Sequence, residues 1–375
     1  NCGMSTLKIL VAPLDWGLGH ATRCIPIINE LVRQDCVVWI AAGGSSLQLL
    51  RKQFPLLPFL RLEGYNVIYH NTKSKFRWTI AKQIPKIITS VKREHRWLKK
   101  AMDEHHFDVI ISDNRYGLYS KKAVSVFITH QLNIKTGMGS LADKLMQKIN
   151  YTHIRNFDEC WVPDFEGKEN LAGGLSHPAV VPSHAKYIGA LSRLEKKEEN
   201  KIYDLLIVLS GPEPRRAIWE QALLNELKTY KGKVLVVRGL PDSNDDIKTD
   251  ERSAIVNFLS SDELGTAIQQ SEWVVCRSGY TSVMDLVQLE HKAILIPTPG
   301  QPEQEYLAQW LHQNEIFYTC AESVFSLEQN LREAEKFPFN FSVFRLFLSG
   351  YKKQIGNLLQ QLASRRHLTE TQRLR

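Results

Sequence analysis

One stretch of the chain combines side chains and backbone turns that suit a phosphorylated sugar. Residues 273–276 are apolar, Ser278-Gly279 make a tight turn, and the next ten residues have the apolar spacing of a helix. The start of a helix presents backbone N–H groups and a partial positive charge, which suit a phosphate. A second apolar run, residues 293–296, ends in a loop with Gln304 and Glu305, whose polar groups suit a sugar. The stretch therefore predicts a nucleotide-sugar site.

Other residues nearby extend this prediction. Arg193 and Arg277 are candidate partners for a phosphate, although most single arginines have no such role. Asp285 lies near the second turn of the predicted helix, where it either reaches a ribose hydroxyl or simply favours the N-terminal half of the helix. Ser210-Gly211 follow another predicted strand, and a glycine turn there lets the backbone approach a ligand closely. The alternative for this turn is an ordinary loop.

A second candidate site lies near the N-terminus, where Gly17 and Gly19 precede His20. A dinucleotide-binding fingerprint requires a third glycine where Thr22 stands, and an acid after the second strand, where the chain has Ala42. A nicotinamide or flavin cofactor is therefore disfavoured. What remains is a glycine turn that places a histidine at the start of a helix.

A neutral histidine in that position can take a proton from a sugar hydroxyl near neutral pH. Asp113 ends another predicted strand of the same half, and we expect it to orient His20, unless it only caps its loop. His130 follows the next strand and is a weaker candidate of the same kind. The alternative for His20 itself is a capping or structural role.

The elements that position these residues form two β-α-β series. Residues 1–190 predict an N-terminal Rossmann-like domain, residues 191–203 a charged linker, and residues 204–345 a second Rossmann-like domain. Residues 346–375 predict a C-terminal helix and tail that return to the first domain. We expect an α/β fold in which two Rossmann-like domains face each other across a cleft, because ligands bind at the strand ends of such sheets.

Composition narrows the function classes. A chain of 375 residues with 43% hydrophobic and 23% charged residues is long enough for two cores. It contains no apolar run long enough to span a membrane and no leader peptide, so we expect a cytoplasmic protein. Its six cysteines are scattered and predict free thiols, not a zinc site. The net charge of +8 suits an anionic substrate or lipid, and no nucleic-acid motif accompanies it.

Residues 73–100 carry ten basic residues against one acid, Glu94, on an amphipathic helical pattern. One interpretation is docking to an anionic membrane surface at the inner face of the membrane. The other is a helix packed on the core, with a solvated basic face.

A family resemblance rests on two segments. Residues 276–285 (Cys-Arg-Ser-Gly-Tyr-Thr-Ser-Val-Met-Asp) and 296–306 (Ile-Pro-Thr-Pro-Gly-Gln-Pro-Glu-Gln-Glu-Tyr) resemble the donor-binding domain of GT-B glycosyltransferases. They are most similar to the family 28 type that includes the peptidoglycan-precursor N-acetylglucosaminyltransferases. The loop of residues 17–20 matches the N-terminal glycine loop and histidine of that group.

The resemblance implies a UDP-sugar as donor substrate, no cofactor and no metal ion. It places the donor in the second domain and an acceptor, lipid-linked or a glycan, in the first. The donor contacts it implies are the diphosphate at Ser278, Gly279 and Arg193, the ribose at Asp285, the sugar at Gln304 and Glu305, and the base at Phe258 and Leu259.

We therefore expect an inverting, metal-independent glycosyl transfer. His20 deprotonates the acceptor hydroxyl while Asp113 orients it, and preorganised donors stabilise charge on the leaving diphosphate. Two alternatives stay open: a UDP-sugar 2-epimerase on the same scaffold, and a non-catalytic protein that binds sugar nucleotides. The sequence does not identify the acceptor or the donor sugar.

Overall fold

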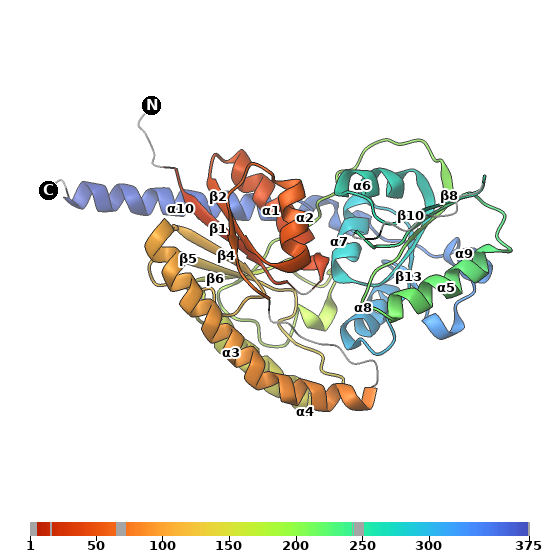
Figure 1. Ribbon diagram of the computed structural model, residues 1–375, viewed down its shortest axis with the longest axis horizontal. Helices are drawn as coiled ribbons and strands as arrows, with labels where there is room; N and C mark the ends of the chain where they lie inside the picture. The colour runs from red at the N-terminus through yellow and green to blue at the C-terminus, as the bar shows by residue number, and fades with distance from the viewer. Residues whose placement is uncertain (1–5, 16, 65–72, 242, 244–250, 374–375) are drawn as a thin grey trace. The chain divides into compact units, whose positions relative to one another are not determined.

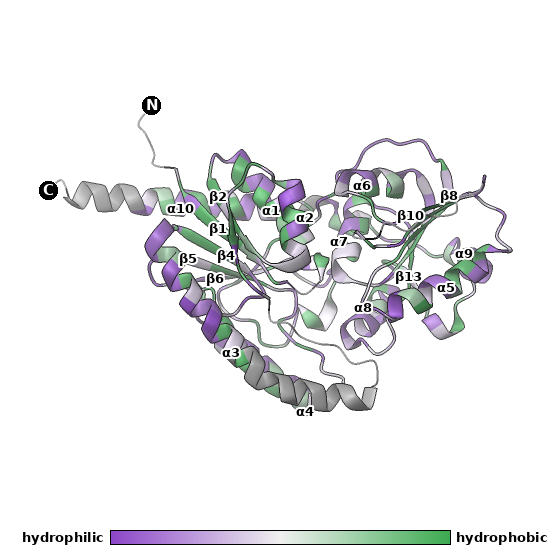
Figure 2. Cartoon of the chain, in the orientation of Figure 1, coloured by the Kyte–Doolittle hydropathy of each residue, from purple (hydrophilic) through white to green (hydrophobic). Residues whose placement is uncertain are grey.

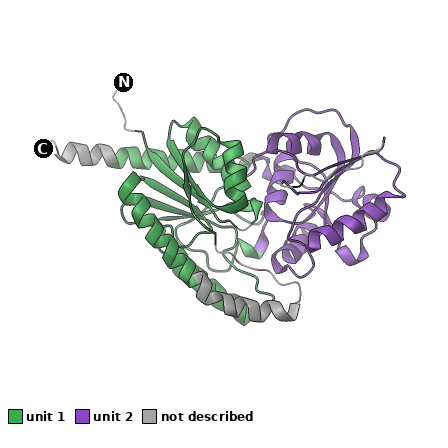
Figure 3. Ribbon diagram, viewed as in Figure 1, with its two compact units in different colours: residues 1–168, 174–191, 347–375 green, residues 169–173, 192–346 purple. Residues whose placement is uncertain are grey.

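A computed structural model of the chain describes residues 6–15, 17–64, 73–241, 243 and 251–373. It divides into two compact units (Figure 3). Unit 1 comprises residues 1–168, 174–191 and 347–375, and unit 2 comprises residues 169–173 and 192–346. Each unit is built on its own parallel β-sheet.

The described part of unit 1 forms a seven-stranded sheet of order β3-β2-β1-β4-β5-β6-β7, with every neighbouring pair parallel. Its central strands are continuous apolar runs, as expected for a sheet that helices cover on both faces. The strands are β1 Lys8–Pro13, β2 Val37–Ala42, β3 Phe59–Arg61, β4 Val109–Asp113, β5 Val124–Ile128, β6 Glu159–Val162 and β7 Ala185–Tyr187.

Strand order and the right-handed crossover rule place the helices of unit 1. The connections through α1 (Leu18–Arg33) and α2 (Gly44–Gln53) step in one direction along the sheet. Those through α3 (Lys73–His105) and α4 (Ser140–Ile154) step the other way. Since such crossovers are right-handed, α3 and α4 cover the same face, opposite α1 and α2 (Figure 1).

The C-terminal helix α10 (Gly350–Arg373) belongs to unit 1 and lies against α1. Gln354 Nε2 donates to Glu159 Oε2 at the start of β6, at 3.0 Å. Gly350 lies so close to the carbonyl oxygen of Ile188 that a Cβ would stand 2.8 Å from it. The end of the chain thus packs on the domain in which it begins.

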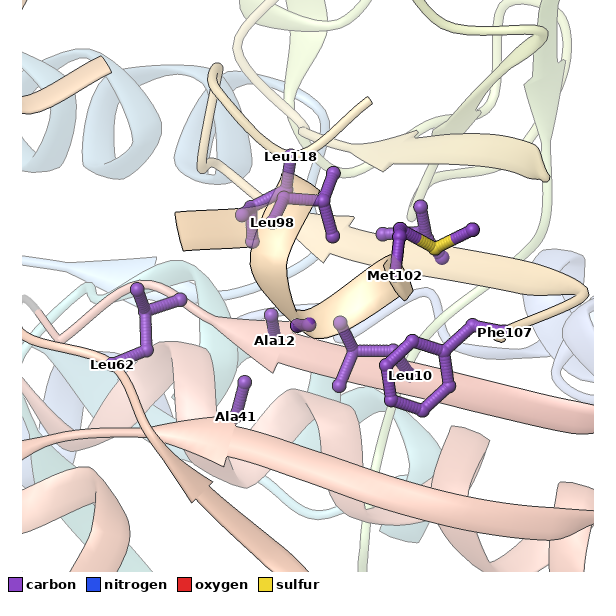
Figure 4. Close-up of a cluster of buried hydrophobic side chains, with 10 residues drawn as sticks. Leu10, Ala12, Ala41, Leu62, Leu98, Met102, Phe107 and Leu118 are labelled. Atoms are coloured by element: carbon purple, nitrogen blue, oxygen red, sulfur yellow. The ribbon is translucent and has the colours of Figure 1, made fainter. Parts of the chain in front are cut away.

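The core of unit 1 shows how α3 is held. Figure 4 shows Leu98 and Met102 of α3 packed among Leu10, Phe107 and their neighbours on the sheet, all buried. Each such side chain contributes about 1.5–3 kcal/mol of burial free energy. Figure 2 shows the apolar strands between helices with polar outer faces. The described half of α3, residues 88–105, is therefore a core-packed helix with a solvated basic face, and the side chains of residues 73–87 lie outside the described part.

Unit 2 has a six-stranded parallel sheet, among its described residues, of order β10-β9-β8-β11-β12-β13. Its strands are β8 Tyr203–Val208, β9 Val234–Val237, β10 Ser253–Val256, β11 Ser271–Cys276, β12 Ala293–Leu295 and β13 Tyr318–Thr319. Its α-helices are α5 Arg215–Leu227, α6 Ser261–Gln269, α7 Tyr280–Leu289, α8 Pro302–Gln313 and α9 Leu327–Ala334. Short 3₁₀ helices are η1 Gly173–Leu175, η2 Glu322–Val324 and η3 Ser342–Phe347.

The segment predicted as a linker is bound along unit 2. The boundary between the units falls between Leu191 and Ser192. Beyond it, the backbone N–H of Lys197 donates to Gln269 Oε1 at 2.5 Å, and Gln269 Nε2 donates to the carbonyl of Glu195 at 3.2 Å. The charged side chains of this segment face solvent while its backbone is tied to α6. No helix in the described part of the chain is long and apolar enough to cross a membrane.

Candidate active site

Unit 1 brings three of the predicted residues to the carboxyl edge of its sheet. His20 lies in the first turn of α1, Asp113 is the last residue of β4, and His130 follows β5. Strands β1, β4 and β5 are neighbours, and Pro13 at the end of β1 pairs with Asp113. His20 Nδ1 consequently lies 3.2 Å from Asp113 Oδ1, the pairing that the sequence predicted.

A fourth residue, Arg23, joins these groups. Its Nε donates to Asp113 Oδ2 at 2.6 Å, and its Nη2 bonds the other carboxylate oxygen. Its Nη1 lies 3.2 Å from Nδ1 of His130. The side chains of Arg23 and Asp113 are 3% and 0% exposed. A buried, two-point pair of this kind is charge-assisted and fixes both side chains.

The pair sets the charge states in the cluster. Burial raises the pKa of Asp113, but the charges of Arg23 and His20 and their hydrogen bonds outweigh it and hold that pKa well below its ordinary value. The pKa of His20 is lowered, first by burial and then by the charge of Arg23, against the raising effect of Asp113. Near neutral pH the site therefore holds a carboxylate, a guanidinium and a neutral imidazole.

The position of Arg23 decides the role that His20 can take. Nδ1 of His20 lies 2.7 Å from Arg23 Nη2, closer than it lies to Asp113. If Nδ1 accepts from Arg23, Nε2 carries the proton and is no base. If Nδ1 donates to Asp113, Nε2 keeps its lone pair and can accept a proton. General-base catalysis by His20 thus requires the second tautomer.

Sequence reasoning missed Arg23, although a signal existed. It stands one helical turn after His20, on the face that also carries the buried residues Ile27 and Pro26. An arginine on the core face of a predicted helix needs a buried carboxylate partner. Gly17, just before α1, has φ +77°, a conformation that favours glycine, whereas Gly19 lies within the helix.

In unit 2 the predicted phosphate turn follows β11. Ser278 is fully buried, and its hydroxyl donates to the carbonyl of Gln304 at 3.0 Å. Gly279 is the N-cap of α7 and provides no side-chain cap. A Cβ at Gly279 would meet no atom within 4 Å, so there is open space in front of the helix start. This combination of space and helix polarity suits an anion.

Gln304 and Glu305 lie in the first turn of α8 and shape the loop before it. Gln304 Oε1 accepts from the backbone N–H of Thr298 at 2.9 Å, and its Nε2 donates to Gln301 Oε1 at 2.7 Å. Glu305 Oε1 accepts from the backbone N–H of Gly300 at 2.8 Å. Ser278 is bonded to this same turn, so the predicted phosphate and sugar elements are joined directly.

Asp285 and Arg193 lie together at the start of unit 2. Asp285 Oδ1 accepts from the Ser192 hydroxyl at 2.6 Å, and the carboxylate also accepts from the backbone of Arg193. Burial raises the pKa of Asp285, against the lowering effect of Arg193 and of these bonds. Arg193 Nη1 donates to Ser261 Oγ at 3.0 Å, in the first turn of α6. A ribose contact by Asp285 would compete with the bond that anchors residue 192.

Arg277 is engaged away from the start of α7. Its Nη2 lies 2.7 Å from Glu322 Oε2, and its guanidinium stacks on the Trp219 ring at 4.9 Å from the centroid. Only 2% of the side chain is exposed. A direct phosphate contact would require this ion pair to open.

The remaining predicted donor residues follow neighbouring strands. Ser210 and Gly211 come after β8 and are exposed, and Gly211 has φ +106°. Phe258 and Leu259 follow β10, with Phe258 36% exposed. All four therefore stand at the carboxyl edge of the sheet, as the sequence predicted from strand ends alone.

The described residues contain no group of three His, Cys, Asp or Glu side chains that could hold a metal ion. The cysteines described in the structure are free thiols, and Cys24, Cys160 and Cys276 are buried. Burial raises the pKa of the Cys160 and Cys276 thiols to about 12, so these two are not nucleophiles near neutral pH.

Comparisons with known proteins identify both units. Residues 206–340 match the sequence model of the glycosyltransferase family 28 C-terminal domain, and residues 7–132 match that of glycosyl transferase family 1. The chain belongs to the GT-B glycosyltransferases. This confirms the resemblance predicted from residues 276–285 and 296–306.

Individual proteins agree with this family and fold. An uncharacterized glycosyltransferase of Methanosarcina acetivorans is 28% identical over 173 residues, and the match spans 42% of each chain. The kitacinnamycin glycotransferase has a TM-score of 0.67 at 13% identity, over 96% of this glycosyltransferase and 100% of that chain. MurG of Acinetobacter baumannii has a TM-score of 0.54 at 14% identity, over 95% and 99%. LpCGTa, solved in complex with UDP, has a TM-score of 0.61 at 12% identity, over 96% and 99%.

Proposed function

We propose that this glycosyltransferase transfers a sugar from a UDP-sugar to an acceptor hydroxyl, with inversion at the anomeric carbon and without a metal ion. The observation that carries the proposal is the open helix start at Gly279 within a family 28 donor domain. The complex of LpCGTa with UDP supports a uridine nucleotide as the donor's leaving group.

In the proposed reaction the diphosphate lies at the start of α7. The helix polarity stabilises the negative charge that grows on the leaving UDP, and it costs no reorganisation during the reaction. The Ser278 hydroxyl, through its bond to Gln304, keeps the α7 and α8 turns in register for phosphate and sugar. Unit 2 is thus the proposed donor domain.

Unit 1 is the proposed acceptor domain. His20 takes the proton from the acceptor hydroxyl through Nε2, and Asp113 accepts from Nδ1–H and stabilises the imidazolium that forms. Arg23 keeps Asp113 ionised and in place. The hydroxyl oxygen then bonds to the anomeric carbon as the bond from that carbon to the UDP oxygen breaks.

A thermal-shift screen tests the donor assignment. UDP at about 100 times its Kd should stabilise the protein by about 2.7 kcal/mol, whereas GDP, AMP and NAD at the same concentration should shift Tm little. Gly279→Val provides the control, because its side chain fits the open space without a clash and should remove the UDP shift. A larger shift with NAD or GDP than with UDP would contradict the proposal.

The same protein separates the proposal from its two alternatives. Incubation with UDP-N-acetylglucosamine and no acceptor should produce slow release of UDP. Appearance of a second UDP-sugar would instead identify a 2-epimerase, and binding without any turnover would identify a sugar-nucleotide-binding protein. As the site of action we propose the cytoplasm, with the basic face of α3 turned to anionic lipid at the inner face of the membrane.

A further inference from the structure

Helix α4 exposes apolar side chains in a regular stripe. Leu141, Leu145 and Ile149 follow one another at intervals of four residues and are 82%, 60% and 39% exposed. Residues at this spacing lie on one side of a helix. Isolated exposed apolar residues are ordinary, but a continuous stripe marks an interaction surface.

The inward side of the same helix is polar, the reverse of an ordinary surface helix. Asp143 accepts from the backbone and the hydroxyl of Thr136, at 2.8 and 2.7 Å. Asn150 is buried and accepts from the Tyr116 hydroxyl at 2.8 Å. These bonds fix the rotation of α4, so the leucines cannot turn inward without breaking them.

Basic residues surround the stripe. Lys144 and Lys148 are exposed and stand one helical turn apart between the apolar residues. Helix α3 covers the same face of the sheet, and its described part adds exposed basic residues there: Lys92, Arg93, Arg96, Lys99 and Lys100. An apolar stripe interleaved with lysines is the pattern of a helix that lies in a membrane interface.

The apolar exposure continues beyond α4. The Tyr151 hydroxyl donates to the carbonyl of Val180 at 2.5 Å, which places the 180–181 loop beside the C-terminal part of the helix. Val180 and Val181 are 71% and 37% exposed. The surface therefore extends over two separate segments of unit 1.

We propose that this surface of unit 1 docks on an anionic lipid bilayer, with Leu141, Leu145 and Ile149 at the boundary between headgroups and acyl chains. The lysines select this occupant over a second copy of the chain. In a two-fold contact the patch would face itself and bring Lys144 and Lys148 against like charges. The described half of α3 buries its own apolar face in the core, so α4 supplies the inserted side chains and α3 supplies charge.

Vesicle flotation tests this surface independently of the transfer reaction. The full chain should float with vesicles of phosphatidylcholine containing about 30% phosphatidylglycerol and bind pure phosphatidylcholine much more weakly. About 1 M salt, which shortens the Debye length to about 3 Å, should weaken the binding. Equal binding to both vesicle types, or to neither, would overturn the proposal.

Variants locate the contact. Leu141→Gln/Leu145→Gln should reduce partition into the anionic vesicles by at least about tenfold, and Lys144→Gln/Lys148→Gln should reduce it less and weaken its salt dependence. Leu56→Gln is the matched control, because Leu56 is 95% exposed in the same unit but outside the surface. All these side chains are exposed, so unchanged Tm values should accompany the losses. Unchanged partition of the leucine variant, or self-association that this variant abolishes, would refute bilayer docking.

Discussion

The buried pair of Arg23 and Asp113 leads to a quantitative stability prediction. Asp113→Asn would leave the guanidinium, 3% exposed, without a counter-charge, and Arg23→Met would leave the carboxylate, 0% exposed, with only His20 at 3.2 Å and the Cys24 thiol at 3.7 Å. Each single change should lower the free energy of unfolding of unit 1 by about 3–5 kcal/mol. The double variant leaves neither charge alone, so its cost should fall short of the sum by at least about 2 kcal/mol.

Hydrogen exchange measured by mass spectrometry is the suitable assay, because a two-unit chain need not unfold in one step. Peptides that cover β1 and β4 report the opening of unit 1, and peptides that cover β11 serve as the internal reference in unit 2. Additive single effects, or a cost below about 1 kcal/mol for either single variant, would refute a buried charge pair at this position.

Four further outcomes follow from the site. Because the Asp113 pKa is held below its unfolded value near 3.9, its contribution to unit 1 stability should be complete above about pH 4 and fall as the pH drops further; acid unfolding followed by hydrogen exchange should lose this slope in Asp113→Asn. Because burial and Arg23 lower the pKa of His20 below 6.5, the acid limb of the kcat/KM profile should lie below pH 6.5; Arg23→Gln should move it upward and Asp113→Asn downward, and an unmoved limb would exclude His20 as the titrating group. Gly279→Val should weaken UDP binding at least about tenfold in calorimetry with Tm unchanged; retained affinity would place the diphosphate elsewhere. Asp285→Asn should lower unit 2 stability by about 1.5–3 kcal/mol in urea unfolding, since Ser192 and the Arg193 backbone bond to its charge; a change confined to UDP affinity would favour the ribose role.

Local patterns in the sequence predict those parts of the fold that depend on neighbouring residues. The apolar run before Ser278-Gly279 and the helical spacing after it correspond to β11 and α7, and the glycine loop before His20 leads into α1. The edge strands β3, β7 and β13 were not predicted, because two or three residues are too few to show an alternation. Their positions depend on pairing with strands already in the sheet.

Side-chain partners depend on contacts that sequence spacing does not contain. Asp113 was predicted to orient His20, yet its closest partner is Arg23, because the two strand ends and one helix turn converge only in the folded unit. Arg277 and Asp285 were predicted to face a ligand, but Glu322 and Ser192 engage them. The reversed polarity of α4 likewise emerges only when burial is known, since its sequence alone is compatible with either face inward.

The central claim is tested most directly by proton NMR of UDP-sugar turnover, with wild type and His20→Ala compared at equal UDP saturation. In UDP-glucose and UDP-N-acetylglucosamine the sugar is α-linked, so an inverting enzyme that passes the sugar to water should release the β anomer first, before mutarotation. We predict β-anomer release by the wild type, and its loss of at least about 100-fold in His20→Ala with UDP affinity unchanged. Initial release of the α anomer, or unchanged turnover in His20→Ala, would contradict the account.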